Sequence, residues 1–153
     1  MGVAYFYHLT RRPLEATLPL LLGKALDAGW RVALRAMEAQ RLDWLDRQLW
    51  HGPAESFLPH GKAGGPHDAL QPVLLTLDKA ANTPACLMSI DGAPITVQEV
   101  EQMQRVCILF DGHDQEAVNT ARAQWVNLKQ AGCAAQYWSE EGGGWEKKAQ
   151  VGC

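Results

Sequence analysis

Short apolar runs alternate along the chain with longer segments in which apolar residues recur at the spacing of a helix. Residues 3–8 are aromatic and apolar, which predicts a first strand. In the segment that follows, Thr10 and Pro13 supply an N-cap and a first-turn proline. The apolar residues of that segment fall on one helical face, at Leu14, Leu18, Leu21, Leu22 and Ala25. We therefore expect a helix that packs on one side.

The same alternation continues through the rest of the chain. Further strands are predicted at residues 31–37, 73–77, 86–90, 105–110 and 133–138. Further helices are predicted at residues 38–50, 96–103 and 114–131, the last one ended by Gly132. The short polar connection at residues 78–84 also allows the strands on its two sides to pair as a hairpin.

This order of elements indicates an α/β fold, with a Rossmann-like, mostly parallel sheet and helices on both faces. A chain of 153 residues is expected to form one core. We predict a single domain over residues 1–139 and a Gly-rich, partly ordered tail over residues 140–153. Residues 52–71 lose all periodicity and collect prolines and glycines, and long loops of this kind often carry function.

Composition excludes several classes of function. Lys and Arg number 14 against 17 Asp and Glu, for a formal net charge of -3. A protein that holds bare DNA or RNA usually carries a basic excess, so direct nucleic-acid binding is disfavoured. The apolar runs are too short to span a bilayer and the N-terminus has no signal-peptide pattern, so a soluble, cytoplasmic protein is expected.

The four cysteines include no close pair. Because zinc knuckles and redox motifs need close pairs, neither is supported. Cys86, Cys107 and Cys133 each lie in or beside an apolar run, which predicts buried, reduced thiols. Cys153 is the last residue of the sequence.

A search for catalytic or cofactor-binding patterns finds little. Neither a Rossmann glycine triplet nor a P-loop is present, and the five histidines have no metal-ligand spacing. The turn at residues 111–116 places Asp111, Asp114 and Glu116 at a helix N-terminus, where they cap the helix and would repel phosphate. We therefore expect no cofactor, no metal and no enzyme activity, and keep a small nucleotide-binding or nucleic-acid-processing enzyme as the alternative.

Two tryptophans occupy positions that burial alone does not explain. On the predicted helix 114–131, Trp125 lies at the edge of the apolar stripe, with Arg122 and Lys129 on its outer flank. These cations either pack along the indole at the edge of the domain or border a pocket for an apolar side chain beside a carboxylate. Trp50 ends its helix directly before the Pro/Gly-rich loop, which is typical of an apolar recognition surface.

The residues around Trp50 carry a family resemblance. Leu-Asp-Trp-Leu-Asp-Arg-Gln-Leu-Trp at 42–50, followed by Gly-Pro-Ala-Glu-Ser-Phe-Leu-Pro-His at 52–60, closely resembles the signature of the chi subunit of bacterial DNA polymerase III holoenzyme. The strand at residues 4–7, the strand start at 71–73 and the helix end around Trp125 also resemble chi. The likeness covers most of the chain and is weakest over residues 79–103 and in the tail.

The resemblance implies an accessory subunit without catalysis of its own. Chi proteins have a fold similar to nucleotide-binding domains without the nucleotide site. They pair with the psi subunit, which tethers them to the clamp loader, and they bind the acidic, Phe-terminated C-terminal tail of single-stranded DNA-binding protein. DNA contact would then be indirect.

By matched position, the resemblance implies a set of contacts for that tail. The candidates are Trp50, Pro53, Phe57 and His60 from the loop region, with Arg122, Trp125 and Lys129 from the helix. The family has basic residues at two further positions of this helix, where the present sequence has Val118 and Val126. An aromatic surface beside cations suits a ligand that ends in Phe and carries carboxylates.

Overall fold

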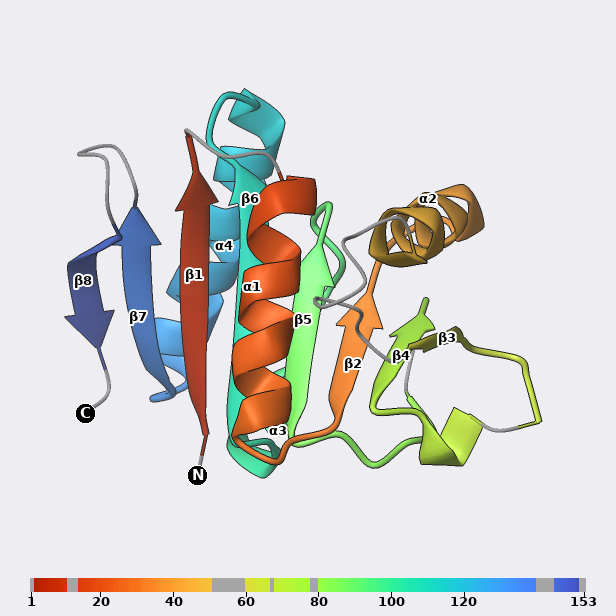
Figure 1. The fold of residues 1–153 in the computed structure, drawn as a ribbon. Coiled ribbons are helices and arrows are strands. Elements are labelled where there is room, and N and C mark those ends of the chain that lie inside the picture. Colours follow the sequence, from red (N-terminus) through yellow and green to blue (C-terminus); the bar gives the residue numbers. More distant parts are fainter. Residues whose placement is uncertain are drawn as a thin grey trace.

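The computed structural model describes residues 2–10, 14–50, 60–66, 68–77, 80–139 and 145–151, with the side chains of Glu15 and Trp50 left undescribed. Within these ranges one sheet has the strand order β3-β4-β2-β5-β6-β1-β7-β8 (Figure 1). The strands are β1 (Val3–Leu9), β2 (Val32–Arg35), β3 (Gly61–Lys62), β4 (Val73–Thr76), β5 (Cys86–Ile90), β6 (Arg105–Asp111), β7 (Ala134–Ser139) and β8 (Glu146–Val151). The helices are α1 (Leu14–Asp27), α2 (Ala39–Trp50), α3 (Val97–Gln102) and α4 (Gln115–Gln130), with a 3-10 turn at Asp68–Leu70. The predicted α/β class is confirmed.

All strand pairs of this sheet are parallel except the last, in which β8 runs antiparallel to β7. The sequence did not predict β8 as a strand. It extends the sheet beyond β7, with Trp138 opposite Lys147 and a register shift between Tyr137 and Trp138.

The helices cover both faces of the sheet, and the direction of each crossover decides which face. The connection through α1 leads from β1 towards the β3 edge, whereas the connection through α4 leads from β6 towards the β8 edge. Because parallel crossovers are right-handed, opposite directions place the two helices on opposite faces. The two core clusters agree: α1 and α2 pack in one, and α3 and α4 pack in the other.

The predicted hairpin between β4 and β5 is wrong. Strand β2 lies between them and pairs in parallel with both. Asn82 in the connection between these strands explains why they do not pair. Its fully buried side chain donates to Val32 O at 3.1 Å and to Gln71 O at 2.9 Å. These carbonyls lie at the amino ends of β2 and β4. The connection has therefore already run back along the sheet before β5 begins.

Local signals in the sequence set the ends of the helices on the α4 face. Thr96 and Glu99 form a complete capping box at the start of α3. Gly132 follows α4 with φ +81, a left-handed conformation that glycine adopts without strain. Helix α4 itself buries Val118, Ala121 and Leu128, as its apolar periodicity predicts.

The three cysteines that the structure describes are buried and reduced, as predicted. Cys107 shares a hydrogen bond with Cys86, and this bond together with burial raises the pKa of the Cys107 thiol. Cys153 lies outside the described residues. No helix in the described part of the chain is long and apolar enough to cross a membrane.

Candidate functional site

Helix α4 presents a half-buried tryptophan between two exposed cations. The ring of Trp125 packs edge-on against Phe6 of β1, with 5.4 Å between ring centroids and 74° between ring planes. It also meets Tyr137 of β7 edge-on, at 6.0 Å and 87°. The aromatic neighbours therefore fix the orientation of the indole on the β7 side of α4.

Arg122 and Lys129 flank this tryptophan on the helix surface, and both side chains are exposed. In the described part of the chain, neither forms an ion pair with an acidic side chain. The cation–π contacts found there belong to Arg41 and Arg105 rather than to Arg122. Arg122 and Lys129 are thus both available to an external anion.

Val118 and Val126, the two positions at which the resemblance implies basic residues, differ in their surroundings. Val118 is buried in the core under α4, so a long basic side chain at that position would have to leave the core. Val126 is 48% exposed and adds apolar surface beside Trp125. Arg122, Trp125, Val126 and Lys129 together form the α4 surface, in which two exposed cations lie beside apolar side chains.

His60 is buried, which is unusual for a residue in a loop rich in proline and glycine. Its side chain is fully buried, and Nε2 lies 3.1 Å from Oδ1 of Asp46 on α2. Directly after His60, Gly61 and Lys62 form β3, and the amine of Lys62 donates to Asp43 of α2 at 2.6 Å. His60 therefore ties the middle of the Pro/Gly-rich loop to α2.

The structure separates the candidate residues into two groups. Arg122, Trp125 and Lys129 lie on the face of the sheet covered by α3 and α4, whereas His60 adjoins α2 on the opposite face. Figure 1 shows α2 near the β3–β4 edge, well apart from α4. The backbone of Trp50 ends α2, while its side chain and residues Pro53 and Phe57 lie outside the described part. One small pocket therefore does not contain His60 together with the three residues of α4.

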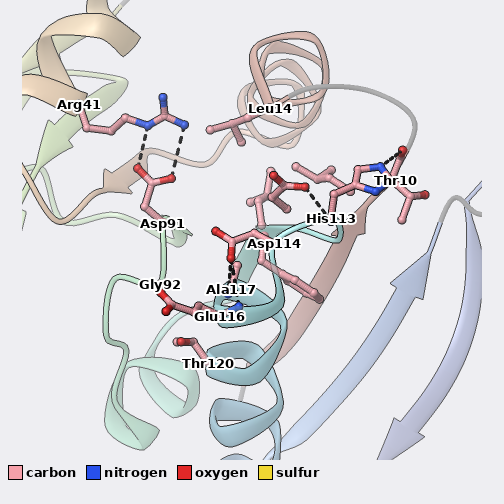
Figure 2. Close-up of a pocket in the computed structure, with 14 residues that line it drawn as sticks. Thr10, Leu14, Arg41, Asp91, Gly92, His113, Asp114, Glu116, Ala117 and Thr120 are labelled. Carbon is pink, nitrogen blue, oxygen red and sulfur yellow. Dashed lines mark hydrogen bonds and ion pairs between the residues drawn. The ribbon is translucent and has the colours of Figure 1, made fainter.

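A crevice of about 700 Å³ opens where β1 and β6 end, at the position where doubly wound folds bind their ligands (Figure 2). Four carboxylates line it: Asp91, Asp111, Asp114 and Glu116. Among the lining residues that the structure describes, the one arginine is Arg41, which is paired with Asp91, with Nε 2.7 Å from Oδ2. These described side chains carry an excess of negative charge, which opposes the binding of a phosphate.

The start of α4 in this crevice is already capped. Oδ1 of Asp114 accepts hydrogen bonds from the backbone N–H groups of Glu116 at 3.0 Å and Ala117 at 3.4 Å. These are the amides that a phosphate would need at a helix N-terminus. His113 Nε2 lies 2.7 Å from the backbone oxygen of Thr10. Within the described ranges, no group of three His, Cys, Asp or Glu residues is arranged to hold a metal ion.

An aromatic groove on the α1 side of the sheet was missed in the sequence. Tyr5 of β1 and Trp138 of β7 line it, with Trp30 and Trp145. The sequence did contain a signal, because Tyr5 and Tyr7 alternate with residues of the other face along β1 and Trp138 does so along β7. Without the strand order, nothing indicated that β1 and β7 are neighbours.

The fold and its surfaces together define a class: an α/β protein with the layout of a nucleotide-binding domain, an acidic crevice among its described residues at the usual position of a phosphate site, and exposed basic and aromatic surfaces elsewhere. Comparison with curated proteins gives no match. A family model described as DNA polymerase III chi subunit, HolC, matches residues 1–136 of the 153. The chain belongs to this family, and the resemblance predicted from the residues around Trp50 is confirmed. The protein is thus an accessory subunit of DNA polymerase III.

Proposed function

We propose that this chain is a non-catalytic adaptor of the clamp-loader assembly, which binds the acidic C-terminal tail of single-stranded DNA-binding protein and the psi subunit at the same time. The observation that carries the proposal is the α4 surface, where two exposed cations that have no anionic partner among the described residues flank the half-buried Trp125. Family membership supports the setting in cytoplasmic DNA replication. DNA is contacted indirectly, through its coating protein.

The spacing of the α4 surface suits an extended acidic peptide. Arg122 and Lys129 are seven residues apart, which is about 10 Å along a helix at 1.5 Å per residue. An extended peptide spans about 10 Å in three residues, so carboxylates about three residues apart meet both cations. A terminal Phe ring then packs on Trp125 and Val126, between the two charges.

The separation of α2 from α4 supports two different contact surfaces for the two partners. An adaptor that holds two proteins together needs two contact areas that do not overlap. We propose the α4 surface for the tail, and we propose that Trp50, Pro53 and Phe57, which the resemblance implies as contacts of the tail, contact psi instead. His60 serves there as a positioning residue, because its buried ring is held against Asp46 of α2.

Two variants test this assignment. Arg122→Ala should weaken a peptide that ends in acidic residues, Pro and Phe, and leave co-purification with psi intact. Trp50→Ala should do the reverse. Loss of tail binding in Trp50→Ala with no effect of Arg122→Ala would contradict the assignment. Hydrolysis or tight binding of a nucleotide by the purified chain would instead support the alternative of a small nucleotide-using enzyme.

A further inference from the structure

The aromatic groove lies on the opposite face of the sheet from the α4 surface. It has a volume of about 920 Å³ and is bounded on one side by Leu20 and Leu21 of α1. On the other side lie Tyr5, Trp138 and Trp145, all of them half-buried. Figure 1 shows α1 over the middle of the sheet, with β7 and β8 extending beyond it and no described helix in front of them. Sheets of mostly parallel strands are normally covered by helices on both faces, so the sheet beside α1 has an open place for one more helix.

The lining of the groove offers mainly apolar contact. The rings of Tyr5 and Trp138 lie side by side, with 6.2 Å between centroids and 40° between planes. The indole N–H of Trp138 already donates to the side chain of Gln136 at 3.2 Å. Leu20, on the rim, is 55% exposed. A partner gains most here by burying aliphatic or aromatic side chains.

Two cations line this groove: the exposed Lys24 and the half-buried Arg105. The guanidinium carbon of Arg105 lies 4.2 Å from the ring centroid of Tyr5 and 5.2 Å from that of Trp30. Its Nε is buried and has no hydrogen-bond partner among the described residues, and no ion pair found there includes Arg105. Cation–π contacts hold the guanidinium in place but leave its N–H groups in need of an acceptor.

We propose that this groove docks an amphipathic helix of a partner protein, with apolar side chains on the aromatic lining and one carboxylate on Arg105. A helix fits because the open place runs beside α1, and neighbouring helices pack at about 8–10 Å between axes. A carboxylate fits because it accepts two parallel hydrogen bonds from a guanidinium. The groove carries Lys24 and Asp27 besides Arg105, and the net charge of -3 of the whole chain opposes a nucleic-acid strand.

The groove and the α4 surface lie on different faces, so both can be occupied at once. This inference does not depend on the assignment of the tail or of psi. It adds a third contact area to the molecule, for a partner recognised through a helix.

A designed helical peptide tests the proposal on the full chain. The peptide carries leucines at positions i, i+3, i+4 and i+7 and a single Glu beside this stripe, and a matched peptide has Gln in place of Glu. Binding is followed by titration calorimetry and by the indole N–H signals in NMR spectra. The Glu peptide should shift the signals of Trp30 and Trp138 and bind about fivefold or more tightly than the Gln peptide, the gain expected for one charge-assisted pair.

Variants separate the charge from the apolar surface. Arg105→Gln should abolish the preference for the Glu peptide, whereas Arg47→Gln, on exposed surface of α2, should preserve it. Leu20→Ser should weaken both peptides alike, and because Leu20 is exposed this change should leave the melting temperature almost unchanged.

Three results would overturn the proposal: no binding of either peptide, equal binding of both to the unaltered chain, or NMR shifts confined to Trp125. A concentration-dependent dimer that Leu20→Ser dissociates would show that a second copy of the chain occupies the groove, which also contradicts the proposal.

Discussion

Removing Arg122 and Lys129 from the α4 surface should weaken binding of the tail, and the exposure of each side chain sets how much affinity is lost. Arg122 and Lys129 are both exposed in the free chain, so each contributes only as much as a solvent-screened ion pair, about 1 kcal/mol. One such loss raises the dissociation constant about fivefold. Because the two side chains are about 10 Å apart and share no partner, their effects should add, so the double variant should bind about 25-fold more weakly.

The assay is a fluorescence-anisotropy titration of a labelled peptide that ends in acidic residues, Pro and Phe. Raising the ionic strength from 0.1 M to 1 M shortens the screening length from about 10 Å to about 3 Å, and should bring the double variant and the unaltered chain close together. Lys62→Ala removes an exposed lysine at the other edge of the sheet and is the matched control. A change of less than twofold in the double variant at low salt would refute the electrostatic reasoning.

Four further predictions concern the stability and packing of the fold. Glu99→Gln leaves Arg35 buried without its carboxylate, to which it donates at 3.0 and 2.6 Å, and should lower the free energy of unfolding by about 3 kcal/mol in a denaturant titration. Burial opposes ionisation of Glu99, but the hydrogen bonds from Arg35 and from the Thr96 backbone lower the pKa of Glu99 below its usual value. The stability that this carboxylate contributes should therefore be complete above about pH 4.5 and be lost as the pH falls through the lowered pKa. Thermal melts of the unaltered chain and of Glu99→Gln at acid pH would show this loss. Gly112→Ala would place a Cβ against the His8 ring and should lower the melting temperature. Gly23→Ala, with nothing within 4 Å of the new Cβ, should instead raise the free energy of unfolding by about 0.5–1 kcal/mol. Cys107 should react with a thiol reagent only after denaturation, because burial and its hydrogen bond raise its pKa; rapid modification of this thiol in the native protein would contradict the packing described.

Periodicity and capping residues predicted most helices and strands, because those signals are local. The Thr96 and Glu99 pair and the glycine after α4 are examples in which the side chains that set an element's ends are adjacent in sequence. Strand β8 gave no such signal. Its residues are exposed on both faces apart from Val151, so apolar alternation is absent and its pairing depends on β7.

The candidate site was predictable in its chemistry but not in its layout. The apolar stripe of α4 correctly placed Trp125 at its edge, between Arg122 and Lys129. The stripe does not reveal which face of the sheet the helix covers, because that follows from the order of strands formed by residues far apart in sequence. For the same reason, the burial of His60 against Asp46 was not predictable from a loop rich in proline and glycine.

The most direct test of the central claim is a map of the tail peptide on the full chain by NMR. With backbone and indole signals assigned, the peptide is added until binding is saturated. The account predicts that the largest shifts fall on the indole of Trp125, the methyl groups of Val126 and the amides of α4 near Arg122, with small shifts around His60. Shifts concentrated on the loop that begins at Trp50, with α4 unaffected, would contradict it.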